Sequence, residues 1–337
     1  MNPTLDLLAV VLQLAIPLAL IVRVAFTRYR GVVALVLEAA VAGVYVVAIA
    51  LAGLWMALPL SMPLLYGILL MAALWRAVRR MDRSGPERAV SPIGVAVRAG
   101  LLLALAVLVV RAVSGRQPLD GTPVALSLPL EGAHWLVGAG GGDPLLNPHL
   151  KTVQAEQFRD YTGQSYAVDL VAEGAWGSRT TVLPTELGDY AAFGRAILAP
   201  CSGRVVVARD GQADLLPAGT EPESLPGNHV ILACSEIWVL LAHMRQGSVA
   251  VAPGDSVRVG QTLGQVGNSG RSDEPHLHIH AQTPGTEAAP LGGSPLPMTF
   301  DGRQLVRNDR VHGLEQQAAR SLEPEAGPSG GPDSLHD

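Results

Sequence analysis

The sequence is poor in lysine, in aromatic side chains and in charge, and each shortage excludes something. Lys151 is the only lysine among 337 residues, aromatic residues make up 4% and charged residues 16%. The net charge is only -5 and no basic stretch is interleaved with aromatics, so the usual footprint of a nucleic-acid-binding protein is missing. The chain has no HExxH, which excludes the helical zinc site in which a glutamate serves as the base.

What is present divides into two unlike halves, of which the first is apolar. Residues 1–115 consist largely of Leu, Val and Ala. A membrane-spanning helix needs roughly 20 mostly apolar residues. Four stretches qualify, at residues 5–26, 32–58, 59–77 and 93–113. We therefore predict an N-terminal α-helical transmembrane bundle of about four spans. Arg98 and Arg111 lie near opposite ends of the fourth span, where both can reach the headgroups.

Arginine placement predicts the orientation of these spans. The loop after the third span holds Arg79, Arg80, Arg83 and Arg88, and the first loop holds Arg28 and Arg30. Basic loops stay in the cytoplasm, so the N-terminus and everything after Ser114 are expected on the extracytoplasmic side. Residues 1–5 lack a basic segment and further spans follow, so we expect no cleaved signal peptide. Glu38 lies inside the second span without an evident partner, and we expect it to be protonated or bonded to another helix.

The second half, residues 118–312, reads as short strands separated by Gly and Pro turns. It predicts an all-β, antiparallel-sheet domain with one short helix at 187–193. The expected strands are 124–128, 133–137, 166–171, 203–209, 229–233, 238–242, 262–266 and 276–282. Residues 313–337 are rich in Glu, Pro, Gly and Ser, which is typical of a disordered tail.

The only two cysteines, Cys201 and Cys234, flank two neighbouring predicted strands. Both lie on the side of the membrane that the arginine pattern makes extracytoplasmic, where disulfides persist. We predict a Cys201–Cys234 disulfide, with two buried thiols as the alternative.

The stretch with the strongest chemical signal is 267–280, GNSGRSDEPHLHIH. His276, His278 and His280 share one face of a strand, because side chains alternate. Histidine binds metals and also titrates near neutral pH. Such a face can therefore hold one imidazole on a metal and another beside a metal-bound water.

The sequence LAHM at 241–244, followed by GDSVRVGQTLGQVGNSGRSDEPHLHIH at 254–280, resembles the M23 (lysostaphin/LytM-type) zinc metallopeptidase family. Residues 199–207 and 227–232 are similar to the preceding strands of that family, and the resemblance covers about residues 145–282. It implies a sheet domain of the duplicated-hybrid-motif-like type with one zinc ion per chain. Carried over, His278 and Asp169 are zinc ligands, and His243 and His276 are the catalytic pair. His280 stands where the family often has Glu, which makes it a candidate neighbour of the ligands.

The remaining zinc ligand is where the sequence departs from the family. The usual HxxxD pattern would place a histidine at Ser165. The nearest substitute is His149, in an Asn-x-His element resembling one that some members carry ahead of a similar Tyr-Ala-x-Asp segment. We predict His149 as the third ligand; His134, His229 or weakened metal binding remain as alternatives.

The resemblance implies a membrane-anchored endopeptidase that hydrolyses peptidoglycan peptide bonds by attack of zinc-bound water. Its location would be the outer side of a bacterial cytoplasmic (inner) membrane, with the lipid bilayer and peptidoglycan peptides as partners, and the sequence indicates no particular protein partner. The alternative is a non-catalytic M23-like domain that binds cell wall or regulates another hydrolase. Residues 254–264 are also similar to lipoyl and biotinyl carrier hairpins. Such carriers attach their cofactor to a lysine, and the only lysine, Lys151, lies outside this segment, which argues against a carrier domain. Glu38 is the only charge deep in a span, so we interpret the helices as an anchor rather than a transporter.

Overall fold

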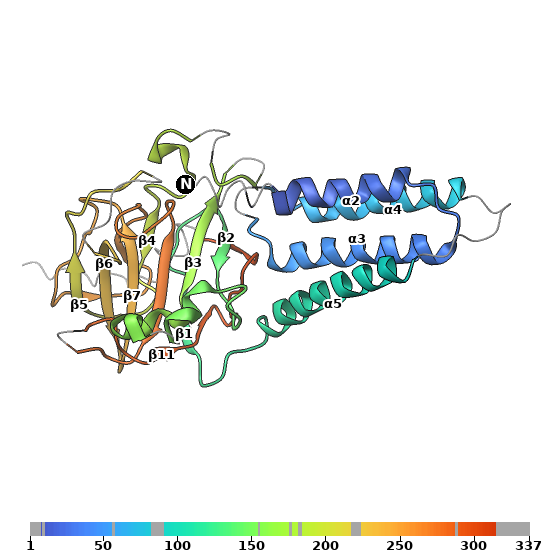
Figure 1. Ribbon diagram of the computed structural model, residues 1–337. Helices are drawn as coiled ribbons and strands as arrows, with labels where there is room; N and C mark the ends of the chain where they lie inside the picture. Colours follow the sequence, from blue (N-terminus) through green and yellow to red (C-terminus); the bar gives the residue numbers. More distant parts are fainter. Residues whose placement is uncertain are drawn as a thin grey trace, which may run out of the picture.

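The structure is a computed structural model that describes residues 8, 11–55, 58–81, 91–153, 156–174, 177–180, 184–216, 224–286 and 289–314. A helical bundle and a β-domain lie end to end (Figure 1). Four predictions fall partly or wholly outside the described residues: the beginning of the first span, residues 56 and 57 of the second span, Arg83 and Arg88, and the predicted tail from residue 315 on.

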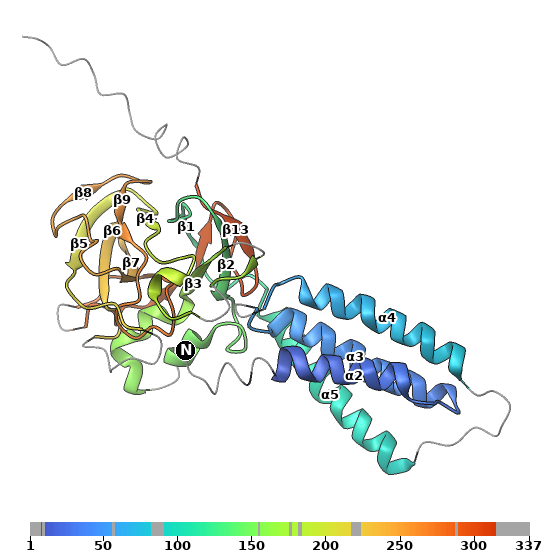
Figure 2. The same cartoon turned by 90° about the horizontal axis from the view of Figure 1, so that it is seen from above.

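Four apolar helices form the bundle. A short π-helix, η1 (Val11–Ala15), continues into α2 (Ile16–Phe26), and α3 (Val32–Ala52), α4 (Met62–Arg80) and α5 (Pro92–Ser114) follow. Helices α3, α4 and α5 are long and apolar enough to cross a membrane, whereas Val11–Phe26 is a shorter apolar helix. In both views α2 lies beside α4 (Figures 1 and 2). The described residues thus give three candidate spans and one shorter helix, where the sequence predicted about four.

Glu38 has partners on two other helices. It is buried in α3, forms an ion pair with Arg23 of α2, and lies 2.8 Å from Nη2 of Arg98 of α5. A buried carboxylate is tolerated when it is paired and hydrogen-bonded. The triad therefore joins three helices near the end of the bundle that is remote from the β-domain.

The β-domain is built on one antiparallel sheet. Its strand order is β13 (Arg310–His312), β2 (His134–Ala139), β3 (Val168–Glu173), β10 (Leu277–Gln282), β7 (Ile237–Met244), β6 (Asn228–Cys234), β5 (Gly203–Arg209) and β8 (Ser256–Val257), with β11 (Pro295–Leu296) also paired to β10. Two small pairs accompany it, β1 (Val124–Leu126) with β12 (Met298–Phe300) and β4 (Ala196–Leu198) with β9 (Thr262–Gln265). The predicted fold class, apolar helices followed by an antiparallel-sheet domain, is confirmed.

Strand β10 separates the core from the face that carries the polar cluster. Leu277, Ile279 and Ala281 enter the main core, together with Leu126, Ile197, Leu263 and Phe300 of the small strand pairs. The alternate residues of β10 face the other side, as alternation requires. The short 3-10 segments η2 (Pro148–Val153) and η3 (Glu156–Tyr166) adjoin this region, and η3 contacts β10. All six residues of β10 are consequently buried.

The structure differs from the sequence prediction in its shortest elements. The helix expected at 187–193 is a single 3-10 turn, η5 (Leu187–Asp189). The sequence pattern did not predict η2, η3 or the short strands β4, β8, β11, β12 and β13. Segments of two or three residues carry too little periodicity to detect, and η3 is a mostly polar run held by its contacts with β10 and β11.

The β-domain contacts the bundle through both apolar and polar groups. Leu146 and Val306 of the domain cluster with Ala112 of α5, and Leu51 and Ala52 of α3 pack against this cluster. Arg111 adds an ion pair with Asp143, at 2.8 Å between Nη2 and Oδ1. The domain is thereby held at the bundle end opposite the Arg23–Glu38–Arg98 triad.

The predicted disulfide is confirmed. Cys201 and Cys234 are bonded, with Cα atoms 6.1 Å apart and a sequence separation of 33. They clamp the hairpin of β5 and β6 at the end where Arg204 pairs with Ala233.

Removing this disulfide should destabilise the β-domain. In the chain-entropy picture, losing a bond that closes a loop of this length lowers the free energy of unfolding by about 3–4 kcal/mol. Chemical denaturation of a Cys201→Ala, Cys234→Ala double variant measures the loss. Reductant should destabilise the wild-type protein and leave the double variant unchanged; equal denaturation midpoints for the two proteins would contradict the prediction.

Candidate metal centre

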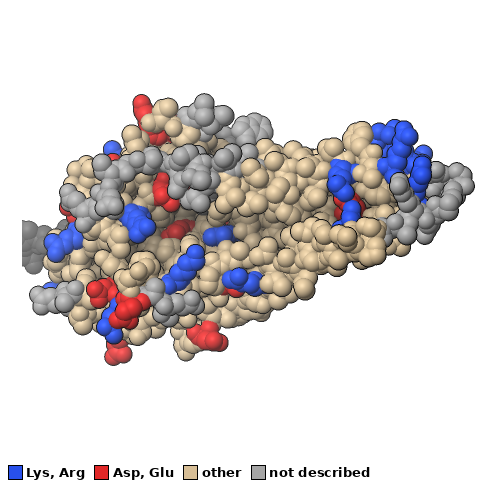
Figure 3. Space-filling view, viewed as in Figure 1, with Lys and Arg blue, Asp and Glu red and all other residues tan. Residues whose placement is uncertain are grey.

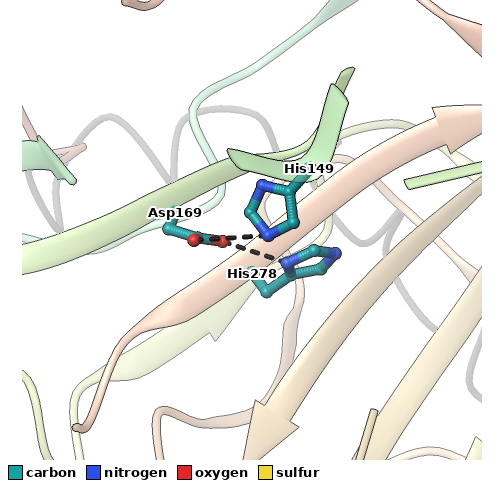
Figure 4. Close-up of side chains that lie close together, drawn as sticks. All are labelled: His149, Asp169 and His278. Atoms are coloured by element: carbon teal, nitrogen blue, oxygen red, sulfur yellow. Dashed lines mark hydrogen bonds and ion pairs between the residues drawn. The ribbon is translucent and has the colours of Figure 1, made fainter. Parts of the chain in front are cut away.

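Two neighbouring strands and a 3-10 segment bring His149, Asp169 and His278 together (Figure 4). Asp169 of β3 lies directly opposite His278 of β10 in the antiparallel register, with His278 Nδ1 3.0 Å from Asp169 Oδ1. His149 comes from η2, and its Nε2 lies 3.5 Å from Asp169 Oδ2. One ligand atom from each residue lies within 4.8 Å of the others. The three residues could hold a metal ion, and no second such group occurs in the described parts of the chain.

Asn147 orients the ring of His149. Its Nδ2 lies within hydrogen-bonding distance of the carbonyls of Gly141, Ser165 and Ala167, at 3.2–3.4 Å, and the side chain is fully buried. Carbonyls only accept, so the amide oxygen must face the other way, toward His149 Nδ1 at 2.9 Å. The proton of the neutral His149 ring is therefore on Nδ1, and Nε2 presents a lone pair toward Asp169.

Ser165, at the position where the family pattern would place histidine, contacts no residue of the cluster through its hydroxyl. The residue is fully buried, and its Oγ lies 2.9 Å from Thr152 Oγ1. The Thr152 hydroxyl in turn donates to the carbonyl of His149 at 2.7 Å. Ser165 thus links η3 to the segment that carries His149.

The predicted catalytic pair, His243 and His276, lies beside this cluster. Their ring centroids are 4.8 Å apart, and His276 Nε2 is 3.7 Å from Asp169 Oδ1. His243 Nδ1 faces the carbonyl of Ser269 and His276 Nδ1 that of Glu274, each at 2.8 Å. Because these carbonyls can only accept, each neutral ring carries its proton on Nδ1. Both Nε2 atoms can therefore accept a proton.

Local backbone geometry fixes His243. Its φ is +61°, a left-handed conformation that non-glycine residues rarely adopt. The backbone amide donates to the carbonyl of Pro226, and the backbone carbonyl accepts from Gly267, both at 3.0 Å. Such strain persists where surrounding contacts determine it and is common at functional sites.

Burial favours the neutral form of three imidazoles in this region, those of His149, His243 and His276. Burial lowers the pKa of His149 to about 4, although Asp169 opposes the shift. It also lowers the pKa values of His243 and His276, and neighbouring histidines add to the effect. For Asp169, burial alone would raise the pKa, but His149, His276 and His278 outweigh it and hold the pKa well below its usual range. At neutral pH the carboxylate of Asp169 therefore lies beside the neutral rings of His149, His243 and His276. Unprotonated ligand groups are the state that binds a metal cation.

These shifts predict acid sensitivity of protein treated with a chelator. Histidines in the unfolded chain take up protons below about pH 6.5, whereas His149 stays neutral to about pH 4 when folded. The unfolded state therefore binds more protons in this window, and the free energy of unfolding falls by up to about 1.4 kcal/mol per pH unit for each such ring. Denaturant unfolding between pH 7 and pH 5 measures the slope. A His149→Asn variant should show a shallower slope; a flat profile in the wild-type protein would contradict the prediction.

The two alternative ligands, His134 and His229, and the predicted neighbour His280 lie outside the cluster. His134 is exposed on β2, with its ring 4.8 Å from that of His312. His229 directs Nδ1 to the carbonyl of Gly227 at 2.7 Å. His280 lies beside His278, with 3.1 Å between its Nδ1 and His278 Nε2.

Three residues near the site were not singled out from the sequence. Asn147 belongs to the Asn-x-His element, and Gln282 continues the alternation of His276, His278 and His280, so both carried a usable signal. Arg307 carried none. It is buried near Asp169, donates from Nε to the carbonyl of Gly138 at 3.0 Å, and burial lowers its pKa to about 10.

Comparison with known proteins gives a family match over part of the β-domain. Residues 188–290 match the model of peptidase family M23. The matched segment contains His243, His276 and His278, whereas His149 and Asp169 precede it. No curated protein matches the chain.

Solved structures give partial matches. A zinc-containing peptidase from Vibrio cholerae is 19% identical with a TM-score of 0.24, over 39% of this chain and 30% of that one. The catalytic domain of the antimicrobial peptidase lysostaphin from Staphylococcus simulans is 22% identical with a TM-score of 0.25, over 37% and 71%. A mutant catalytic domain of a prophage-encoded M23 protein from Enterococcus faecalis is 28% identical with a TM-score of 0.20, over 36% and 85%.

Proposed function

We propose that this chain, which carries a domain of peptidase family M23, is a membrane-anchored zinc endopeptidase that cleaves peptide bonds of peptidoglycan. The observation that carries the proposal is the convergence of His149, Asp169 and His278 beside His243 and His276.

The donor atoms of the cluster fit zinc. Two imidazole nitrogens and one carboxylate oxygen are ligands that catalytic zinc sites use, and three protein ligands leave a further position for a reactant. When bound, the ion supplies Lewis acidity, which polarises a peptide carbonyl and makes water more acidic. His149, Asp169 and His278 would hold it.

The catalytic histidines supply the proton transfers. His243 and His276 each present an unprotonated Nε2, so either ring can take a proton from an attacking water. Once protonated, the same nitrogen becomes a donor that can meet the charge developing on the carbonyl oxygen or protonate the leaving amine. Their Nδ1 bonds to backbone carbonyls keep both rings oriented throughout.

Charge distribution supports the proposed orientation. Exposed Arg28, Arg30, Arg79 and Arg80 lie at the bundle end remote from the β-domain, and Figure 3 shows the basic cluster there. Basic residues flanking spans favour the cytoplasm, which would place the β-domain outside. The Cys201–Cys234 disulfide agrees with an oxidising compartment. Outside the cytoplasmic membrane, the peptides that an M23 domain would meet are those of the cell wall.

One observation favours a second function, a wall-binding or regulatory domain without activity. Ser165 cannot supply the histidine ligand that the HxxxD pattern places at its position. In a decayed site, the loss of that histidine would abolish metal binding. Against this, His149 lies within ligand distance, and the other four residues expected from the family are all present.

Digestion of peptidoglycan tests the proposal. The full chain in detergent, loaded with zinc, is incubated with purified peptidoglycan, and mass spectrometry identifies the released fragments. Fragments with newly formed peptide termini are expected from the wild-type protein and not from an Asp169→Asn variant. Zinc-loaded protein that sediments with peptidoglycan yet opens no peptide bond would favour the second function.

A further inference from the structure

Behind His278, a line of buried side chains leads away from the metal cluster. His278 Nε2 lies 3.1 Å from His280 Nδ1, and His280 Nε2 lies 3.2 Å from Gln282 Oε1. Gln282 Nε2 donates to the carbonyl of Pro290 at 2.8 Å. His280 and Gln282 are each only 1% exposed, so each contact is shielded from water.

The direction of this chain of hydrogen bonds is set at its far end. The Pro290 carbonyl can only accept, so it fixes the Gln282 amide with Nε2 toward Pro290 and Oε1 toward His280. Oε1 also only accepts, so His280 must donate from Nε2. A neutral His280 ring then has no proton on Nδ1 and accepts from His278 Nε2. The proton of His278 is therefore held on Nε2, and Nδ1, which faces Asp169, is left with a free lone pair.

The surroundings are shaped to keep the Gln282 amide in this orientation. A Cβ atom at Gly163 would overlap the amide, and one at Gly293 would lie 2.8 Å from Gln282 Nε2. Both positions thus require the smallest residue for Gln282 to fit. The amide is enclosed between η3 and the segment before β11, and it has little room to rotate.

We infer that His280 and Gln282 are positioning residues that hold His278 in the tautomer required for metal binding. The inference rests on the proposed zinc centre and goes beyond it, because neither residue belongs to the group of His149, Asp169 and His278. Metal-binding histidines depend on such partners at the opposite ring nitrogen, and losing one typically weakens metal binding by about 10- to 100-fold.

Zinc affinity of a Gln282→Met variant tests the inference. Methionine is close in length to glutamine but offers no strong acceptor, so His280 loses the group that fixes its proton. We expect the full chain in detergent to bind zinc about 10- to 100-fold more weakly in competition with a chelator. Thermal unfolding of the chelator-treated protein should remain near wild type. Gln265→Met is the matched control. Gln265 lies on β9, where its Oε1 accepts from Arg245, so the zinc affinity of this variant should not change.

A rescue variant separates positioning from packing. In a His280→Glu, Gln282→Met double variant, the carboxylate can accept directly from His278 Nε2 without the rest of the chain. We expect zinc affinity to return toward the wild-type value. Rescue is also informative if the single variant folds poorly, because a packing defect at position 282 would persist in the double variant.

Two results would overturn this inference and leave the proposed function standing. One is unchanged zinc affinity in Gln282→Met. The other is a loss of affinity that is matched by lower stability without zinc and is not rescued by His280→Glu. If the wild-type chain itself binds no zinc, both this inference and the proposed zinc peptidase are wrong. Zinc binding by the wild-type chain therefore distinguishes failure of the inference from failure of the proposed function.

Discussion

Replacing His149 with alanine should remove zinc from the protein, whereas replacing Ser165 with alanine should leave about one zinc per chain. His149 Nε2 faces Asp169, and the ring is held in the metal-binding tautomer by Asn147. Its loss leaves two ligands, so the expected decrease in zinc affinity exceeds the roughly 10- to 100-fold typical of residues that only contact a ligand. Elemental analysis and chelator competition on the full chain measure both variants.

Ser165→Ala is the decisive comparison because Ser165 occupies the family's usual ligand position. Its hydroxyl contacts Thr152 rather than Asp169 or His278, so it contributes to packing of η2 and η3. We expect a modest loss of stability and no loss of metal stoichiometry. His134→Ala serves as a second control, because this exposed histidine lies outside the cluster. If His149→Ala keeps its zinc while Ser165→Ala loses it, the assignment of the third ligand is wrong.

The sequence predicted the part of the site that depends on local periodicity. His276, His278 and His280 alternate along one strand, so their common face followed from the residues alone. That Asp169 lies directly opposite His278 depends on the register between β3 and β10, which are separated by more than 100 residues. Only the family resemblance indicated that pairing in advance. The approach of Arg307 from the C-terminal segment had no local signal at all.

Tertiary partners also explain what the sequence left open in the bundle. Glu38 was evident as an ionisable residue in an apolar segment, but Arg23 and Arg98 lie on other helices and become partners only once the helices pack. Apolar length predicted the helices well, because it depends on composition alone. For the first helix, the described part, Val11–Phe26, is shorter than the predicted span.

Under the proposed function, replacing His243 or His276 with alanine should leave zinc bound and remove most of the proposed peptidase activity. Neither residue belongs to the three-residue metal cluster, and both present Nε2 as a proton acceptor beside it. General acid–base catalysis contributes about 10²- to 10⁴-fold, so each variant should lose activity by roughly that factor. Turnover of a peptide substrate and zinc content are measured on the same preparations. His229→Ala is the matched control, since this partly buried histidine on β6 should affect neither quantity.

The pH profile of the same variants tests the assigned role. A base must be unprotonated to act, so wild-type activity should fall on the acid side as the catalytic rings gain protons. Burial lowers the pKa values of both His243 and His276, which places this fall below the ordinary histidine range near pH 6.5. In the variant that lacks the base, the remaining activity should depend less on pH in that range. An alanine variant that retains zinc and full activity would remove its histidine from the mechanism, and loss of zinc from either variant would place that residue among the ligands.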